Sequence, residues 1–89
     1  MPVFAIIASG DGPGLGLIIK SKVQQQDYHQ VDDDTWLVSA PQNIVTPKEL
    51  SDFLGISAGA VGRVIILHVT TYFGFHKRDV WDWLSIKGV

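Results

Sequence analysis

The chain contains no cysteine among its 89 residues, so it can form neither a disulfide framework nor a thiolate zinc site. Charged residues are also scarce, at 18% of the sequence, and nine acidic against seven basic residues give a net charge of −2. Domains that coat nucleic acid usually carry a strongly basic face. The composition therefore argues against such coating as the main task, although it permits a local basic patch.

No uninterrupted apolar run approaches the roughly 20 residues of a membrane-spanning helix. The apolar run Val3–Ala8 follows no Lys or Arg and is short for the core of a signal peptide. We therefore expect a cytoplasmic protein without a membrane partner.

Hydrophobic residues, by contrast, make up 46% of the sequence, which is too many for a disordered chain. A chain of this length is expected to form a single domain, residues 1–89, that buries only about 60–65% of its unfolded surface. So small and apolar a domain is stabilised further when a partner covers its remaining apolar surface. The composition therefore favours a homodimer.

The longest β-prone run extends from Arg63 to Phe73 and is bracketed by Gly62 and Gly74. Its β-branched residues favour a pleated backbone. Apolar side chains occupy both alternating positions of the run, as they do in Val3–Ala8, so both segments are predicted to be strands buried on two faces.

Between these strands the sequence predicts a helix and a hairpin. The helix runs to about Gln25, and the hairpin joins residues 28–31 to residues 35–39 through three aspartates that suit a turn. The aspartates lack the spacing of a calcium loop, so a solvated turn is the preferred interpretation. The predicted buried side of the helix consists of Leu15, Leu17, Ile18, Ile19 and Val23.

The clearest local signal is a helix start at Thr46. Thr46 suits the N-cap, Pro47 the first helical position, and Glu49 completes a capping box. Gly55 suits a left-handed C-cap at the other end of this helix.

A last helix is predicted over Lys77–Ile86. Trp81 and Trp83 lie about 200° apart around it, at 100° per residue. One tryptophan therefore needs a second surface, which either this subunit or a neighbour supplies. We place Trp81, Trp83 and Tyr72 in a dimer interface.

The order strand, helix, strand, strand, helix, strand, helix predicts an α+β protein. The arrangement is ferredoxin-like βαββαβ, with a four-stranded antiparallel sheet plus a C-terminal helix. Two helices cover one face of such a sheet and leave the other face open. We expect the C-terminal helix, a second subunit, or both to cover that open face.

A rival interpretation takes Pro47–Arg63 as a helix-turn-helix. Its second helix would contain two glycines, at a cost of about 2 kcal/mol of helix propensity. It would also offer DNA little beyond Ser57 and Arg63. The strand interpretation is therefore favoured, and a helix-turn-helix DNA-binding protein is the second alternative.

Ser9 and Asp11 are the candidate catalytic pair, in a glycine-rich stretch that joins the first strand to the first helix. This stretch lacks the spacing of dinucleotide and Walker loops, which favours a connector over a phosphate loop. Asp11 could hold a divalent metal at a dimer axis, with water and substrate phosphates as further ligands. Such an aspartate more often caps a helix.

The three histidines, His29, His68 and His76, share no metal-ligand spacing. His76, however, forms a compact basic cluster with Lys77 and Arg78 beside an aromatic-rich stretch. This cluster is the candidate nucleic-acid-binding site because such side chains contact phosphate, although a solvated helix start is the preferred interpretation.

The strand order and four segments together carry a family resemblance. These segments are Asp34-Thr-Trp-Leu-Val38, Thr46–Leu54, Gly62–Phe73 and Val80-Trp-Asp-Trp-Leu84. The chain resembles small SinR-like proteins and, more distantly, the CRISPR-associated adaptation nucleases, which implies a ferredoxin-like fold and a homodimer. In those nucleases an aspartate that closes the first strand is proposed to bind metal. Here Ala8 and Ser9 occupy that place, and Asp11 lies in the following loop.

The preferred hypothesis is a non-catalytic homodimeric interaction or assembly module that associates with DNA or RNA and needs no cofactor. The alternative is a metal-dependent nuclease that uses Asp11 and Ser9 with Mg²⁺ or Mn²⁺.

Overall fold

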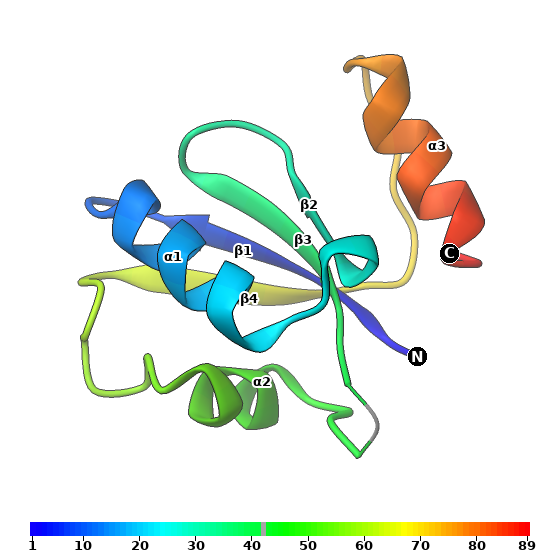
Figure 1. Cartoon of the computed structure of the whole chain (residues 1–89). Coiled ribbons are helices and arrows are strands. Elements are labelled where there is room, and N and C mark those ends of the chain that lie inside the picture. The colour runs from blue at the N-terminus through cyan, green and yellow to red at the C-terminus, as the bar shows by residue number, and fades with distance from the viewer. Residues whose placement is uncertain (42) are drawn as a thin grey trace.

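The computed structural model describes residues 1–41 and 43–89. The strands are β1 (Val3–Ala8), β2 (Tyr28–Gln30), β3 (Thr35–Ser39) and β4 (Val64–Val69). The helices are α1 (Gly12–Lys22), α2 (Pro47–Leu54) and α3 (Arg78–Ile86), with a short 3-10 helix, η1 (Gln25–Asp27), before β2. The order of elements along the chain agrees with the prediction (Figure 1).

The four strands form one antiparallel sheet in the order β2-β3-β1-β4. This order confirms the predicted α+β architecture and is consistent with a ferredoxin-like arrangement. α1 and α2 pack on one face of the sheet, and α3 packs on the other (Figure 1). The two cores therefore lie on opposite sides of β1.

The main core lies between the sheet and the helices α1 and α2. Alternate residues of β1, Phe4 and Ile6, point into it and are fully buried. From α1, Leu15 and Ile19 meet them at helical spacing. The predicted buried side of α1 is wrong at Leu17, which is 73% exposed because it lies about 200° around the helix from Leu15.

α1 is also shorter than predicted. It ends at Lys22 rather than near Gln25, because Val23 adopts extended backbone angles (φ −119°, ψ 138°). Val23 is nevertheless buried, and it joins the main core from the loop that follows the helix.

The predicted capping box at the start of α2 is confirmed. The backbone N–H of Glu49 donates to Thr46 Oγ1 at 3.1 Å, and the backbone N–H groups of Thr46 and Val45 each donate to Glu49 Oε1 at 3.0 Å. Gly55 ends the helix in the left-handed region, with φ 73°. Local chemistry thus accounts for both ends of α2.

The Glu49 carboxylate makes the contribution of this cap to stability depend on pH. Its pKa lies below the ordinary value of 4.5, chiefly because the backbone N–H of Val45 donates to the charged form and then because the Thr46 side chain does. When the pKa of a carboxyl is lower in the folded state than in the unfolded state, its charged form stabilises the fold at pH values above the unfolded-state pKa. This contribution to stability is lost as the pH falls through the folded-state pKa.

We therefore expect Glu49→Gln to lose less stability than the wild type between about pH 6 and about pH 3. Glutamine keeps an acceptor oxygen for the cap but does not titrate. Urea unfolding at the two pH values measures the difference. An identical loss in both proteins would contradict this account of the cap. Asp52, whose pKa is lowered by Ser57 and then by Lys48, contributes to the acid sensitivity that remains.

The run 63–73 forms a strand, but the strand ends at Val69 instead of Phe73. β4 pairs with β1 from Ala8↔Val64 to Val3↔Val69, so the next pair would join Pro2 to Thr70. The Pro2 carbonyl oxygen accepts from the Ala40 N–H on the β3 side, and the pairing with β4 stops at Val3.

Within the single subunit this strand is not covered on both faces, and cover by a second subunit stays a prediction. β4 lies at the edge of the sheet, and Ile65 and Leu67 are 57% and 50% exposed. The helix-turn-helix interpretation is wrong, because residues 57–63 form turns and bends and residues 64–69 form β4.

Candidate functional site

α3 covers only part of the sheet face opposite α1 and α2. Val80 and Leu84 of α3 are buried with Val3 of β1 and Leu37 of β3 in a second, smaller core. This contact confirms that the C-terminal helix covers the open face, as expected, but the cover stops short of the far ends of β1 and β4.

The uncovered part of this face is apolar. Ile7 of β1 lies opposite Ile65 of β4, and Leu67 lies one step along the same face of β4. All three side chains are exposed, at 36%, 57% and 50% respectively. We call Ile7, Ile65 and Leu67 the β4 patch. It adjoins the outer edge of β4, which pairs with no other strand in the part of the chain that the structure describes.

The residues predicted for the dimer interface make contacts within the subunit. The Tyr72 ring stacks on Trp81, with centroids 5.9 Å apart and planes 9° apart, and its hydroxyl donates to the carbonyl oxygen of Val89 at 2.8 Å. Trp83 packs beside His29, with ring centroids 6.1 Å apart. Tyr72 thus supplies the second surface that one tryptophan needed. A role for Tyr72, Trp81 and Trp83 between subunits stays a prediction.

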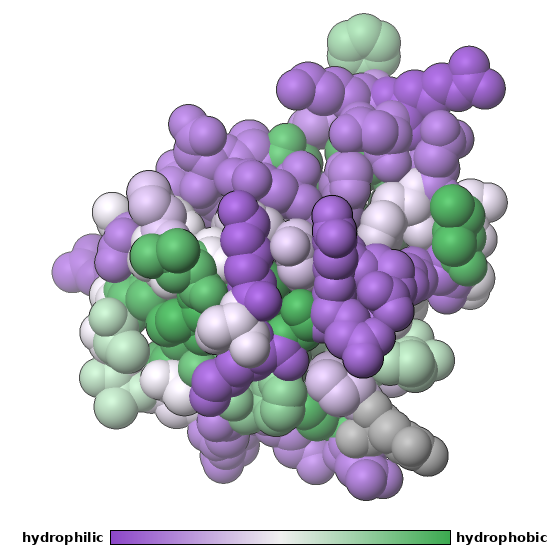
Figure 2. Space-filling model, in the orientation of Figure 1, coloured by the Kyte–Doolittle hydropathy of each residue, from purple (hydrophilic) through white to green (hydrophobic). Residues whose placement is uncertain are grey.

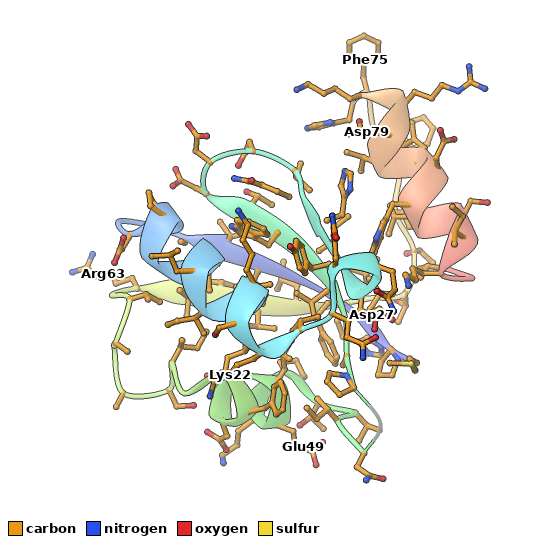
Figure 3. The ribbon with its side chains drawn as sticks, viewed as in Figure 1. Lys22, Asp27, Glu49, Arg63, Phe75 and Asp79 are labelled. Carbon is orange, nitrogen blue, oxygen red and sulfur yellow. The ribbon has the colours of Figure 1, made fainter. Side chains whose placement is uncertain are left out.

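Two polar contacts link α3 and the residue after it to the β2 side of the sheet. His29 Nε2 lies 3.3 Å from a carboxylate oxygen of Asp79, and Lys87 Nζ lies 2.8 Å from that of Asp27 (Figure 3). The Lys87 pair is partly buried and lies between η1 and the C-terminal end of α3. These contacts, with the smaller core, hold α3 against the sheet.

A shallow groove of about 540 Å³ runs between α3 and the segment of η1 and β2. Trp83 lines it from α3, and Gln25, His29 and Gln30 line it from η1 and β2. The buried atoms His29 Nε2 and Trp83 Nε1 have no partner of hydrogen-bond geometry. The His29–Asp79 contact is therefore best described as an ion-pair distance without an aligned hydrogen bond.

The connector from β4 to α3 carries two phenylalanines that contact almost nothing. Phe73 and Phe75 are 101% and 102% exposed, and Phe75 stands beyond the N-terminal end of α3, away from the sheet (Figure 3). The predicted basic residues His76, Lys77 and Arg78 follow at once. We call Phe73–Arg78 the arch.

The arch thus brings the predicted basic cluster together with aromatic residues that were not predicted as site residues. The sequence showed an aromatic-rich stretch beside the cluster, but it did not show that two of its rings would leave the sheet. The β-propensity of the run suggested a buried position for Phe73 instead.

Ser9 and Asp11 occupy structural positions at the start of α1. An Asp11 carboxylate oxygen accepts from the backbone N–H of Gly14 at 2.9 Å as the helix N-cap, and the Ser9 N–H donates to the Arg63 carbonyl oxygen at 2.9 Å. A side chain at Gly12 would collide with the backbone oxygen of Asp33, so close packing accounts for one glycine of this stretch. A catalytic role for Ser9 and Asp11 stays a prediction.

Within residues 1–41 and 43–89, no group of three or more His, Asp and Glu side chains is placed to hold a metal ion. Over the same residues, no helix has the length and apolar character needed to cross a membrane. No protein-family profile matches the chain, and no curated protein matches it significantly.

Proposed function

We propose that this chain is a non-catalytic, homodimeric interaction module of the cytoplasm that associates with nucleic acid. The dimer is supported by the β4 patch, which is the observation that carries the proposal. Three neighbouring aliphatic side chains, Ile7, Ile65 and Leu67, are exposed to solvent beside an unpaired strand edge. Fully burying one such side chain is worth about 1.5–3 kcal/mol, so a second copy packed on this patch would stabilise both.

The symmetry of the contact fits the patch. In a two-fold dimer the same surface of each subunit meets its counterpart, so one apolar patch per chain is sufficient. A stable interface takes about 800 Å² from each partner. That is roughly a seventh of the 5528 Å² surface of this chain, so the β4 patch would form the centre of the interface and polar residues its rim.

The non-catalytic part of the proposal is supported by the position of Asp11, which a nuclease of the kind considered above would need for metal. Its carboxylate serves as the cap of α1. Incubation of the pure protein with RNA and DNA, with Mg²⁺ or Mn²⁺ and with chelator, tests this part. Metal-dependent cleavage that is lost in Asp11→Ala would contradict it.

The association with nucleic acid is supported by the arch, where His76, Lys77 and Arg78 are consecutive and exposed. Lys77 has no acidic partner among the described residues, and Arg78 makes only an exposed contact of 3.9 Å with Asp82. Such cations are free to contact phosphate.

We expect multi-angle light scattering to give twice the 9.8 kDa mass of one chain at micromolar concentration. The mass should halve on dilution below the dissociation constant. A monomer mass throughout the micromolar range would contradict the homodimer.

A further inference from the structure

The arch is held at both ends and free in the middle. On one side, Tyr72 is fixed by its stacking on Trp81 and by its hydrogen bond to Val89. On the other side, the chain enters α3 at Arg78. Between these two points the rings of Phe73 and Phe75 are exposed as fully as they would be in an extended peptide. An anchored segment loses less conformational freedom on binding than a free tail.

Exposed aromatic rings next to cations indicate a particular kind of ligand. Figure 2 shows an apolar side chain standing above the hydrophilic surface at the N-terminal end of α3, where Figure 3 labels Phe75. Burying a phenylalanine is worth about 1.5–3 kcal/mol, so each ring offers binding free energy that the isolated subunit does not use. The ligand should therefore present apolar faces together with negative charge.

The arch itself carries two cations, Lys77 and Arg78, and no acidic residue. The His76 ring accepts from the Lys77 backbone N–H through Nδ1 at 2.8 Å, so in the neutral ring Nε2 carries the proton and can donate to a phosphate. The nearest acidic residue, Asp79, lies at ion-pair distance from His29 on the sheet. Asp82 meets Arg78 only at 3.9 Å between largely exposed groups, which is a weak interaction.

We propose that the arch binds single-stranded nucleic acid, with bases stacked on Phe73 and Phe75 and phosphates in contact with Lys77 and Arg78. This inference rests on the nucleic-acid association proposed above and specifies its substrate. A duplex hides the faces of its bases within the helical stack, whereas a single strand presents them to aromatic rings. Phenylalanine has no hydrogen-bonding group, so the binding should be largely independent of sequence.

The test is fluorescence anisotropy with a labelled single strand of about 12 nucleotides, a length within the usual range for such sites, and with the duplex of the same sequence. Both DNA and RNA are measured. We expect the wild type to bind the single strand at least about ten-fold more tightly than the duplex, since stacking is worth about 1–3 kcal/mol for each base.

The double variant Phe73→Ala/Phe75→Ala should weaken binding of the single strand by about ten-fold or more and leave duplex binding unchanged. The double variant Lys77→Ala/Arg78→Ala should weaken binding of both. It should also lower the dependence of log affinity on log salt by about 1.4 for the single strand, at about 0.7 for each phosphate contact. Phe53→Ala, which alters a partly exposed ring on α2, is the matched control and should change neither.

The outcomes separate the inference from the proposal on which it rests. No binding of either nucleic acid at low salt would overturn the association itself. Equal binding of single strand and duplex, unaffected by the phenylalanine variants, would overturn the single-strand inference and leave the association standing. Sedimentation with vesicles of phosphatidylcholine and phosphatidylserine covers another ligand, because phenylalanine-dependent retention on vesicles without binding to a single strand would assign the arch to lipid.

Discussion

Gly16→Ala is expected to destabilise the fold by about 1–3 kcal/mol, the usual cost of an extra methyl group in a packed core. Helix propensity alone predicts the opposite, because alanine is better than glycine in a helix interior by about 1 kcal/mol. A Cβ atom at this position, however, would lie 2.6 Å from Cζ2 of Trp36. Urea unfolding of the two proteins measures the difference.

Trp36 has little freedom to move aside. Its side chain is 2% exposed, Tyr28 meets its ring edge-on with centroids 5.9 Å apart, and Lys20 Nζ lies 5.7 Å from the ring centroid. The collision must therefore be relieved by moving α1 away from the sheet, which loosens the main core on both sides of Gly16. In a domain of this size, such a loss is a large fraction of the total stability.

A second variant, Trp36→Phe, tests whether contact with the Trp36 ring causes the loss of stability in Gly16→Ala. Phenylalanine removes the ring atom that the new methyl group would meet, together with the buried Nε1 that has no hydrogen-bond partner. The double variant Gly16→Ala/Trp36→Phe should therefore be more stable than the sum of the single changes predicts, by about 1 kcal/mol. Gly10→Ala is the control, because a side chain there meets nothing within 4 Å. Strict additivity would contradict the proposed collision.

Leu67→Asp is expected to convert the proposed dimer into a monomer of 9.8 kDa at micromolar concentration. The change would place a carboxylate without a partner in the centre of the proposed interface, and burying an unpaired charge costs several kcal/mol. The subunit itself should tolerate the change, since Leu67 is already half exposed in it. Light scattering over a range of concentrations gives the mass, and thermal unfolding checks the fold.

The control for this variant is Leu17→Asp. Leu17 is also an exposed leucine, but it lies on α1, across the sheet from the β4 patch. Its replacement should leave the dimer intact. Dissociation by both changes, or by neither, would show that the β4 patch is not the interface.

The sequence predicted most accurately those features that local chemistry determines. Thr46, Glu49 and Gly55 set the ends of α2 through contacts within a few residues, so their pattern could be interpreted without knowledge of the rest of the fold. The hairpin around the three aspartates was confirmed for the same reason.

The exposure of β4 could not be predicted in this way. Apolar residues on both alternating positions have the same pattern in a strand buried by its own subunit and in a strand left for a partner. Only the sheet order, which depends on pairings across the whole chain, puts Ile65 and Leu67 at an edge. The stacking of Tyr72 on Trp81 likewise joins the connector after β4 to α3. Helical spacing relates residues within α3 alone, so it could not indicate this contact.

The end of β4 at Val69 has a consequence for the other side of the molecule. Thr70 and the residues after it leave the sheet, so the chain crosses toward α3 instead of lengthening the strand. Phe73 and Phe75 lie on this crossing segment, outside both cores, and their rings are therefore left to solvent.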